Sequence, residues 1–387
     1  MNINWENIRK NQFPSLKNQI HMKAAGGSPM CKSAYSKGTK YFRNIYKKGD
    51  IFWDHYFKEM EEARELVADY LNSNTNEISF LINTSSGINI ISHLLNQGTI
   101  LYPEGEFPSS ILPFKLKDFN CIKIRSKNKK YRAEDIEETV HSNHDYLIQS
   151  YVQYLTGFKQ ELGKIGRITY KNKVIYIINA TQAFGALPLD VKRQKIDILV
   201  ASGLKWACCG YGAAILYVKE KILEDKNLPC LSWLSVRNKF AMDNDNTDVI
   251  KQTKAMDSFG GTPNFPALMA LKGSLELIKD IGAGDINVGI REIYKRIKFL
   301  TNKFIRELQD LGHKIISPLD LKYRSGIITM QHQNAKAIYK ELLKNNIHIS
   351  LRNYPSSQNK DLLRFALHYY NNLEDIRNVV SVLKRCG

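Results

Sequence analysis

The feature of this sequence that most constrains its fold is a succession of short apolar runs alternating with helix-like segments between about residues 77 and 260. The run at 174–178 reads Val-Ile-Tyr-Ile-Ile and is typical of a strand buried on both faces, because it is short, continuously apolar and rich in β-branched side chains. Strands that alternate with helices form a mostly parallel sheet covered by helices. The sequence therefore predicts an α/β fold for this region.

The flanking segments predict the rest of the architecture. Residues 51–70 have apolar side chains at i, i+3 and i+4 and predict a long amphipathic helix. A helix over 266–281 would leave the sheet domain, and a helix over 288–311 with short strands and two further helices would form a smaller α+β domain. A chain of 387 residues is too long for one ordinary domain. We expect an N-terminal arm at 1–20, a large domain at 21–265, and a linking helix with a small C-terminal domain at 266–387.

Lys205 is the strongest candidate for chemistry. It lies between the apolar run at 198–201 and a small-residue turn, Cys209-Gly210-Tyr211-Gly212. An amine held in such a pocket has a lowered pKa and can form a Schiff base with a carbonyl group. The alternative is a lysine whose stem packs on apolar surface while its amine reaches solvent.

Polar residues follow two of the expected strands. Asn179 and Gln182 come just after the run at 174–178, and the carboxyl ends of such strands border the crevice where open α/β sheets bind ligands. Ser85 and Ser86 follow the apolar run at 78–82 and precede a helix-like segment. Hydroxyls and free N–H groups at a helix start form a phosphate site. The alternative for this pair is an ordinary Ser/Thr N-cap.

Together these segments resemble the class V aminotransferase family of pyridoxal 5'-phosphate (PLP) enzymes, which includes cysteine desulfurases, kynureninase and isopenicillin N epimerase-like proteins. The resemblance rests on Asn179, Gln182 and Ser202-Gly203-Leu204-Lys205-Trp206, and on other segments that follow in the family's order over nearly the whole chain. It implies fold type I of the PLP-dependent transferases, PLP as cofactor and Lys205 as its catalytic anchor. It also implies a homodimer with active sites shared between subunits.

For the cofactor, the resemblance implies three groups of contacts. Ser85, Ser86 and Ser202 would hold the phosphate, while Asn179 and Gln182 would bind the ring. Thr262, in Gly260-Gly261-Thr262-Pro263-Asn264, would reach the phosphate of the neighbouring subunit, the alternative being a plain turn before a helix. Phe107 would pack on the ring, the alternative being a core phenylalanine.

For the substrate, the resemblance implies that Arg364 anchors a carboxylate, since a planar guanidinium meets a carboxylate with two parallel hydrogen bonds. A surface arginine is the alternative. Arg352 is a second candidate for an anion contact, and Gln153 and Tyr154 are candidates to touch the substrate or the phenolic oxygen of the cofactor. Gly26 belongs to a small-residue loop, 24–29, that resembles the loop over the family's active-site mouth.

The sequence departs from the family pattern in two places. Asn179 stands where the family normally has aspartate, whose charge keeps the pyridine nitrogen protonated. The segment 353–360 contains no cysteine, whereas desulfurases place a nucleophilic cysteine on the loop before the C-terminal arginine strand. Phe107, where many relatives have histidine, favours the kynureninase-like or epimerase-like branch over the desulfurases.

The cysteine content, hydropathy and net charge of the sequence indicate the cellular compartment and the kinds of partner to expect. The six cysteines form no CxxC pair and no metal cluster, and no apolar run reaches membrane length. We therefore expect a cytoplasmic protein with free thiols and no metal. The net charge of +18 comes from scattered lysines, which favours a generic basic surface over a nucleic-acid groove.

These observations predict an aminotransferase that moves an amino group between an amino acid donor and a small keto acceptor, for which the basic charge favours an anionic or phosphorylated compound. The alternatives are an epimerase or C–S/C–C lyase, and a catalytically retired PLP-fold binding protein.

Overall fold

A computed structural model describes residues 3–126, 130–354 and 360–386 of the chain. Its centre is a seven-stranded sheet in the order β2-β8-β7-β6-β5-β3-β4. The strands from β7 to β4 are parallel, whereas β8 runs antiparallel to both β7 and β2. The prediction of a mostly parallel sheet is confirmed. The strands are β2 (Ile78–Leu81), β3 (Thr99–Pro103), β4 (Asn120–Ile124), β5 (Tyr146–Ser150), β6 (Ile175–Asn179), β7 (Ile198–Ser202) and β8 (Ala214–Val218).

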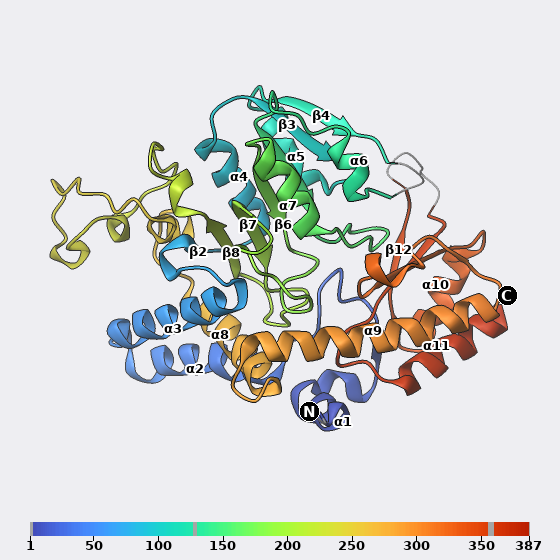
Figure 1. Ribbon diagram of the computed structural model, residues 1–387. Helices are drawn as coiled ribbons and strands as arrows, with labels where there is room; N and C mark the ends of the chain where they lie inside the picture. Colours follow the sequence, from blue (N-terminus) through green and yellow to red (C-terminus); the bar gives the residue numbers. More distant parts are fainter. Residues whose placement is uncertain (1–2, 127–129, 355–359, 387) are drawn as a thin grey trace.

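The central strands are buried on both faces, which explains why their sequences are continuously apolar. Successive residues of a strand point to opposite faces, so Tyr176 and Ile178 of β6 enter one hydrophobic core while Ile177 enters the other. Helices α4 and α5 cover the second face, and α3, α7 and α8 contribute to the first. Figure 1 shows the sheet with α2, α3 and α8 on one side of it.

The helices of this part match the expected periodicity. The helix expected at 51–70 is α3 (Trp53–Leu71), and the one expected at 266–281 is α8 (Phe265–Ile281). The others are α2 (Lys32–Lys48), α4 (Thr84–Leu94), α5 (Pro108–Lys115), α6 (Ala133–Glu137) and α7 (Leu162–Lys171). Short 3-10 helices are η1 (Pro14–Lys17), η2 (Thr75–Glu77), η3 (Glu220–Ile222), η4 (Trp233–Ser235), η5 (Lys239–Ala241), η6 (Thr253–Phe259) and η7 (Leu321–Tyr323).

The C-terminal part forms a separate antiparallel sheet with its own hydrophobic core. The strand order is β12-β13-β10-β9, and helices α9, α10 and α11 pack against it. Its elements are α9 (Ile286–Asp310), β9 (Lys314–Ile315), β10 (Ile327–Gln331), α10 (Ala335–Lys344), β11 (Ile347–His348), β12 (Ser350–Arg352), β13 (Leu362–Ala366) and α11 (Leu373–Cys386).

The start of the chain lies against this C-terminal part. Helix α1 (Trp5–Gln12) lies close to α9 in Figure 1, and β1 (Ile20–His21) pairs in parallel with β11. Met22 belongs to the C-terminal core. The domain boundaries at residues 20 and 265 stay predictions. Among the described residues, every helix is too short or too polar to cross a lipid bilayer.

Candidate active site

Lys205 lies in a small cavity at the carboxyl ends of β6 and β7, beside the N-terminus of α4. We call this the lysine cavity; its volume is about 160 Å³. Seven of the thirteen predicted site residues line it, at the edge of the sheet where polar groups were expected to meet. The described lining residues are Asn83, Thr84, Ser85, Phe107, Ser109, Ser150, Tyr154, Asn179, Thr181, Gln182, Ser202, Leu204 and Lys205.

The Lys205 side chain is half-buried and its amine faces the cavity. Burial, and then the positive charges of Arg364 and Arg352, together lower the pKa of Lys205 to about 8. The Nζ atom lies 5.9 Å from the centre of the Phe107 ring. Near neutral pH a far larger fraction of this amine is uncharged than of an ordinary lysine, which favours the Schiff-base prediction.

The N-terminus of α4 borders the same cavity. Asn83 is its N-cap and accepts a hydrogen bond from the Ser86 N–H at 2.9 Å, so the expectation of a Ser/Thr cap is wrong. The Ser86 hydroxyl donates to the Asn83 carbonyl at 2.7 Å and is not part of the cavity wall, whereas Ser85 lines the cavity. Thr84 and Thr181, which the sequence analysis missed, share a 2.7 Å hydroxyl contact there.

Ser202 contributes a hydroxyl that lacks a protein partner. Its side chain is 2% exposed, and its Oγ has no hydrogen bond within the described structure. A buried hydroxyl without a partner loses free energy unless a ligand or water supplies a hydrogen bond. Together with Ser85 and the helix N-terminus, it forms a polar site that suits a phosphate.

Asn179 and Gln182 present amide groups to the cavity. The Asn179 Oδ1 accepts the Thr181 N–H, and its Nδ2 donates to the Ser110 hydroxyl, both at 3.0 Å. Gln182 donates to the Ala25 carbonyl at 3.0 Å and accepts from the Trp206 indole N–H at 2.9 Å. Each side-chain amide has two N–H donors, so one N–H of each remains for a ligand.

Arg364 is a buried cation next to the lysine cavity. Its side chain lies on β13 and is 2% exposed, so it is no surface arginine. Its guanidinium donates to the Tyr154 carbonyl at 2.6 Å and to the Ser350 hydroxyl at 3.3 Å, while its Nε has no partner. Burial, and then the charge of Arg352, lower the pKa of Arg364 to about 9. Among the described residues no carboxylate pairs with it, so the site favours an anionic ligand.

Other predicted residues lie outside the lysine cavity. The Gln153 side-chain Oε1 accepts from the N–H groups of Leu155 and Thr156, and its Nε2 donates to the Gly105 carbonyl at 2.8 Å. Gln153 lines a second cavity next to the lysine cavity, and its contact with substrate or cofactor stays a prediction. The Gly26 N–H donates to the Lys23 carbonyl, in a loop that borders the lysine segment.

Arg352 and Thr262 are both exposed. Arg352, at the end of β12, acts on the site through its charge, as the lowered pKa values of Lys205 and Arg364 indicate. Thr262 does not line the lysine cavity of its own chain. Residues 355–359 of the cysteine-free loop lie outside the described residues.

The backbone beside Lys205 is held by a buried histidine that the sequence analysis did not single out. The His368 Nδ1 accepts the Tyr369 N–H, so its Nε2 carries the proton and donates to the Trp206 carbonyl at 2.7 Å. Burial lowers the pKa of His368 to about 3, which keeps the ring neutral. Histidine in a tyrosine-rich C-terminal segment gave no local signal for this role.

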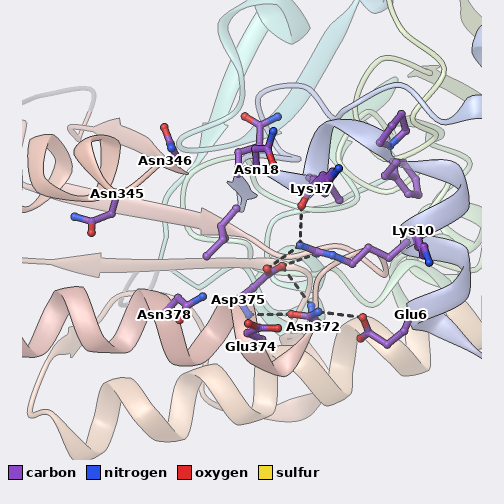
Figure 2. A pocket seen from close by; sticks show the side chains of 16 residues that line it. Glu6, Lys10, Lys17, Asn18, Asn345, Asn346, Asn372, Glu374, Asp375 and Asn378 are labelled. Atoms are coloured by element: carbon purple, nitrogen blue, oxygen red, sulfur yellow. Dashed lines mark hydrogen bonds and ion pairs between the residues drawn. The ribbon is translucent and has the colours of Figure 1, made fainter.

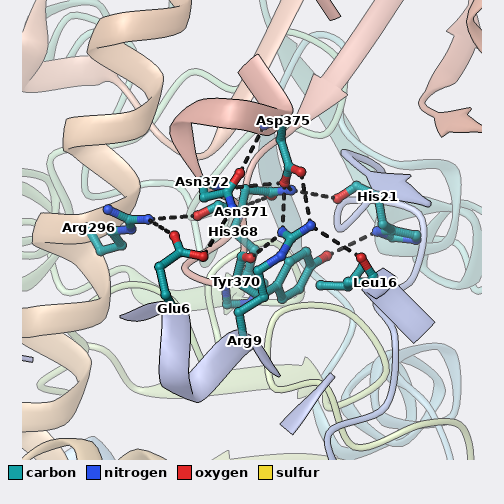
Figure 3. Close-up of polar contacts among 10 residues, drawn as sticks. All are labelled: Glu6, Arg9, Leu16, His21, Arg296, His368, Tyr370, Asn371, Asn372 and Asp375. Carbon is teal, nitrogen blue, oxygen red and sulfur yellow. Dashed lines mark hydrogen bonds and ion pairs between the residues drawn. The ribbon is translucent and has the colours of Figure 1, made fainter. Parts of the chain in front are cut away.

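A polar network connects this histidine to the N-terminal arm (Figure 3). The Asn371 side chain accepts a hydrogen bond from the backbone N–H of His368 and donates one to the Asp375 carboxylate at 2.8 Å. Asp375 in turn receives two hydrogen bonds from Arg9, at 2.8 and 2.9 Å. Figure 2 shows the surface pocket of about 850 Å³ that adjoins this ion pair, lined mainly by asparagine and charged side chains.

Comparison with known proteins identifies the family. The family model described as "Aminotransferase class-V" matches residues 20–379. A probable cysteine desulfurase of Pyrococcus abyssi is 24% identical, over 89% of this chain and 87% of its own length. A kynureninase of Bacillus thuringiensis subsp. konkukian is 26% identical, over 74% and 67%. The structure of the cystine C–S lyase C-DES in complex with cysteine persulfide has a TM-score of 0.85 at 21% identity, covering 96% of this chain and 99% of that one.

Relatives of both kinds match, so the expected kynureninase-like branch stays a prediction. The lysine cavity fits the family's cofactor, PLP. The Ser202 hydroxyl and the N-terminus of α4 suit its phosphate, the free N–H groups of Asn179 and Gln182 suit its ring, and the Lys205 amine suits its aldehyde. The chain belongs to the class V aminotransferase family, and its cofactor is pyridoxal 5'-phosphate.

Proposed function

We propose that this protein is an aminotransferase that moves an amino group from an α-amino acid to a small keto acceptor. The observation that carries the proposal is the pairing of an amine of lowered pKa, Lys205, with a buried guanidinium that lacks a carboxylate, Arg364. The guanidinium suits the carboxylate of an amino acid, and the amine suits proton transfer beside it.

The cofactor, when bound, withdraws electrons from the carbon that bears the amino group. Residues of the chain bind and orient the substrate and transfer the proton. Arg364 fixes the carboxylate, the Phe107 face limits the tilt of the ring, and Lys205 accepts a proton from the substrate carbon and returns it to the cofactor side. Transamination needs only this shuttle, so it is the simplest outcome of the geometry.

Asn179 modifies this chemistry. Its neutral amide can donate an N–H to an unprotonated ring nitrogen but cannot stabilise a charged one, which makes the ring a weaker electron acceptor. Asp fits the same place, because a carboxylate can still accept from the Thr181 N–H, and the Ser110 hydroxyl, which now accepts from Asn179, can turn to donate to it. We expect Asn179→Asp to change the visible spectrum of the bound cofactor and its pH dependence. An unchanged spectrum would contradict the inference that the neutral Asn179 amide makes the ring a weaker electron acceptor.

The test of the proposed function is the visible absorption spectrum of the holoenzyme with a panel of amino acids. We expect one donor to convert the cofactor to its amine form, and a keto acid to restore it. If product forms while the cofactor never changes to the amine form, lyase or epimerase chemistry replaces transamination. If added PLP gives no visible band, the protein is a retired enzyme.

The second candidate is a C–S lyase, which the fold similarity to a cystine C–S lyase favours. Elimination of a substrate thiol needs no enzyme thiol. Desulfuration by an enzyme thiolate, the activity named for a relative of Pyrococcus abyssi, is disfavoured here, because none of the six cysteines, all within the described part of the chain, lines the lysine cavity. Release of pyruvate and a persulfide from cystine, without amine-form cofactor, would establish this candidate.

We further propose a homodimer in which Thr262 completes the site of the neighbouring subunit. Thr262 is exposed and does not line the lysine cavity of its own chain. Exposed aromatic side chains on α2, Tyr35, Phe42 and Tyr46, offer apolar surface for a second copy. A monomer in sedimentation equilibrium that still binds PLP tightly would contradict this arrangement.

A further inference from the structure

A second cavity adjoins the lysine cavity. We call it the outer cavity; its volume is about 630 Å³, and it lies between the β3–α5 connection, α5 and the loop after β5. It shares two lining residues with the lysine cavity, Phe107 and Tyr154, whose rings meet edge to face with centroids 5.4 Å apart. This aromatic pair therefore borders both cavities.

The outer cavity has aromatic and apolar walls. Tyr102, Tyr131, Tyr154, Phe107, Ile111 and Leu112 are among its lining residues. A pocket of this size and composition matches those that bury a sizeable apolar ligand group.

Its formal charge is balanced. Two carboxylates, Glu104 and Glu106, face two lysines, Lys115 and Lys123, among the described lining residues. Both carboxylates already accept hydrogen bonds, Glu104 from Ser126 and Glu106 from Ser150. A cavity without excess charge favours a neutral group over an acidic or basic one.

The position of Arg364 favours a substrate orientation in which the side chain faces the outer cavity. Arg364 contacts the Tyr154 carbonyl, and the Lys205 amine lies 5.9 Å from the centre of the Phe107 ring, so a substrate held by both would place its side chain beside the Phe107–Tyr154 pair. A small side chain such as a methyl group would end there, whereas a large one would continue into the outer cavity.

We propose that the outer cavity binds the side chain of the amino substrate and selects donors with a bulky, neutral aromatic side chain. The proposal rests on the proposed function, because it assumes that the substrate is an amino acid anchored at Arg364. The Phe107–Tyr154 pair is then the entrance that the aromatic side chain passes.

The test compares two tryptophan substitutions on α5 and its C-terminus. Both residues are exposed, at 53% and 76%, but only Leu112 lines the outer cavity. Leu112→Trp therefore adds volume at the cavity, whereas Leu116→Trp adds the same ring outside it. In Leu112→Trp we expect kcat/KM to fall at least tenfold for phenylalanine and tyrosine and to stay within twofold for alanine. Leu116→Trp should change neither. Equal kcat/KM for alanine and phenylalanine in the unmodified enzyme, or an equal loss for both donors in Leu112→Trp, would overturn the proposal.

A binding measurement separates this proposal from the proposed function. 3-Phenylpropanoate and propanoate have a carboxylate but no amino group, so calorimetric titration of the holoenzyme needs no turnover. We expect 3-phenylpropanoate to bind at least tenfold more tightly than propanoate, and Leu112→Trp to abolish the difference. If 3-phenylpropanoate binds more tightly but no donor converts the cofactor to its amine form, the outer cavity is a side-chain site and the protein is not an aminotransferase. If the two acids bind equally, the outer cavity is not a side-chain site.

Discussion

At the scale of single residues, Arg364 shows how an unpaired buried charge marks a binding site. A buried guanidinium without a carboxylate is costly for the folded state, and the substrate carboxylate can relieve that cost. We expect Arg364→Gln to lower kcat/KM for amino acid donors by about 100-fold, which corresponds to the loss of about 3 kcal/mol of charged hydrogen bonds.

The same substitution should leave the thermal stability of the cofactor-free protein unchanged or higher, because an uncompensated charge is removed. Arg377→Gln, an exposed arginine on α11, is the control and should change neither activity nor stability. A strong loss of stability in Arg364→Gln would mean that the guanidinium is a structural element.

Lys205 gives a pH-dependent prediction. Its folded-state pKa of about 8 lies below the ordinary lysine value, so the amine of the cofactor-free protein becomes uncharged as pH rises through 8. The rate of PLP capture should rise about tenfold per pH unit below this value and level off above it. Stopped-flow absorbance measures the profile, with Lys205→Ala as control. A rate that keeps rising toward pH 10 would indicate an ordinary solvated amine.

The stability of the cofactor-free protein should follow the same group. Between about pH 8 and the ordinary lysine pKa, the unfolded chain holds a proton that the folded protein has released. The contribution of Lys205 to the free energy of unfolding therefore increases with pH across this window, and Lys205→Met should remove that increase.

At the scale of secondary-structure elements, the position of α4 on the sheet decides where the phosphate site lies. Gly87 is pressed against β7, because a Cβ there would approach the Val200 Cγ2 atom to 2.5 Å. We expect Gly87→Ala to push the helix from the sheet, to destabilise the protein by about 1–3 kcal/mol, and to weaken PLP affinity.

Gly163, in the first turn of α7, is the matched control for that substitution. A Cβ there meets only the Arg167 side chain, at 3.9 Å. Gly163→Ala should therefore stabilise the protein by up to about 1 kcal/mol through helix propensity and leave PLP affinity unchanged. Urea unfolding and equilibrium titration with PLP measure both effects. Equal responses at the two glycines would contradict the close approach of α4.

Much of the element layout could be predicted from the sequence, because helix and strand periodicity are local signals. The buried strand at 174–178 and the helix at 51–70 lie within a few residues of β6 and α3. The position of the antiparallel strand β8 between β2 and β7 could not be predicted from local patterns, because strand order depends on pairing between distant segments. The contacts of the Gln153 side chain could not be predicted for the same reason, because its partners are backbone groups of a loop whose shape the sequence does not reveal.

At the scale of the whole molecule, the two ends of the chain meet. Arg9 and Asp375 are 366 residues apart, yet they form a two-hydrogen-bond ion pair in which the Asp375 side chain is 4% exposed. No local pattern in the sequence could identify Arg9 as the partner of Asp375. The pair matters for the site, because Asp375 connects through Asn371 to the histidine that holds the Trp206 carbonyl.

This connection leads to a prediction about the N-terminal arm. Arg9→Gln leaves the buried Asp375 carboxylate without its cation and should lower the free energy of unfolding by about 3 kcal/mol. Lys10→Gln, next to it but exposed, should have little effect. If the two ends act as a unit, the double variant Arg9→Gln/Asp375→Asn loses much less than the sum of its single variants. Loosening the arm should also free His368, which would shift the pH midpoint of PLP capture in Arg9→Gln but not in Lys10→Gln. Additive losses with an unchanged midpoint would show that the arm only covers the C-terminal core and has no influence on Lys205.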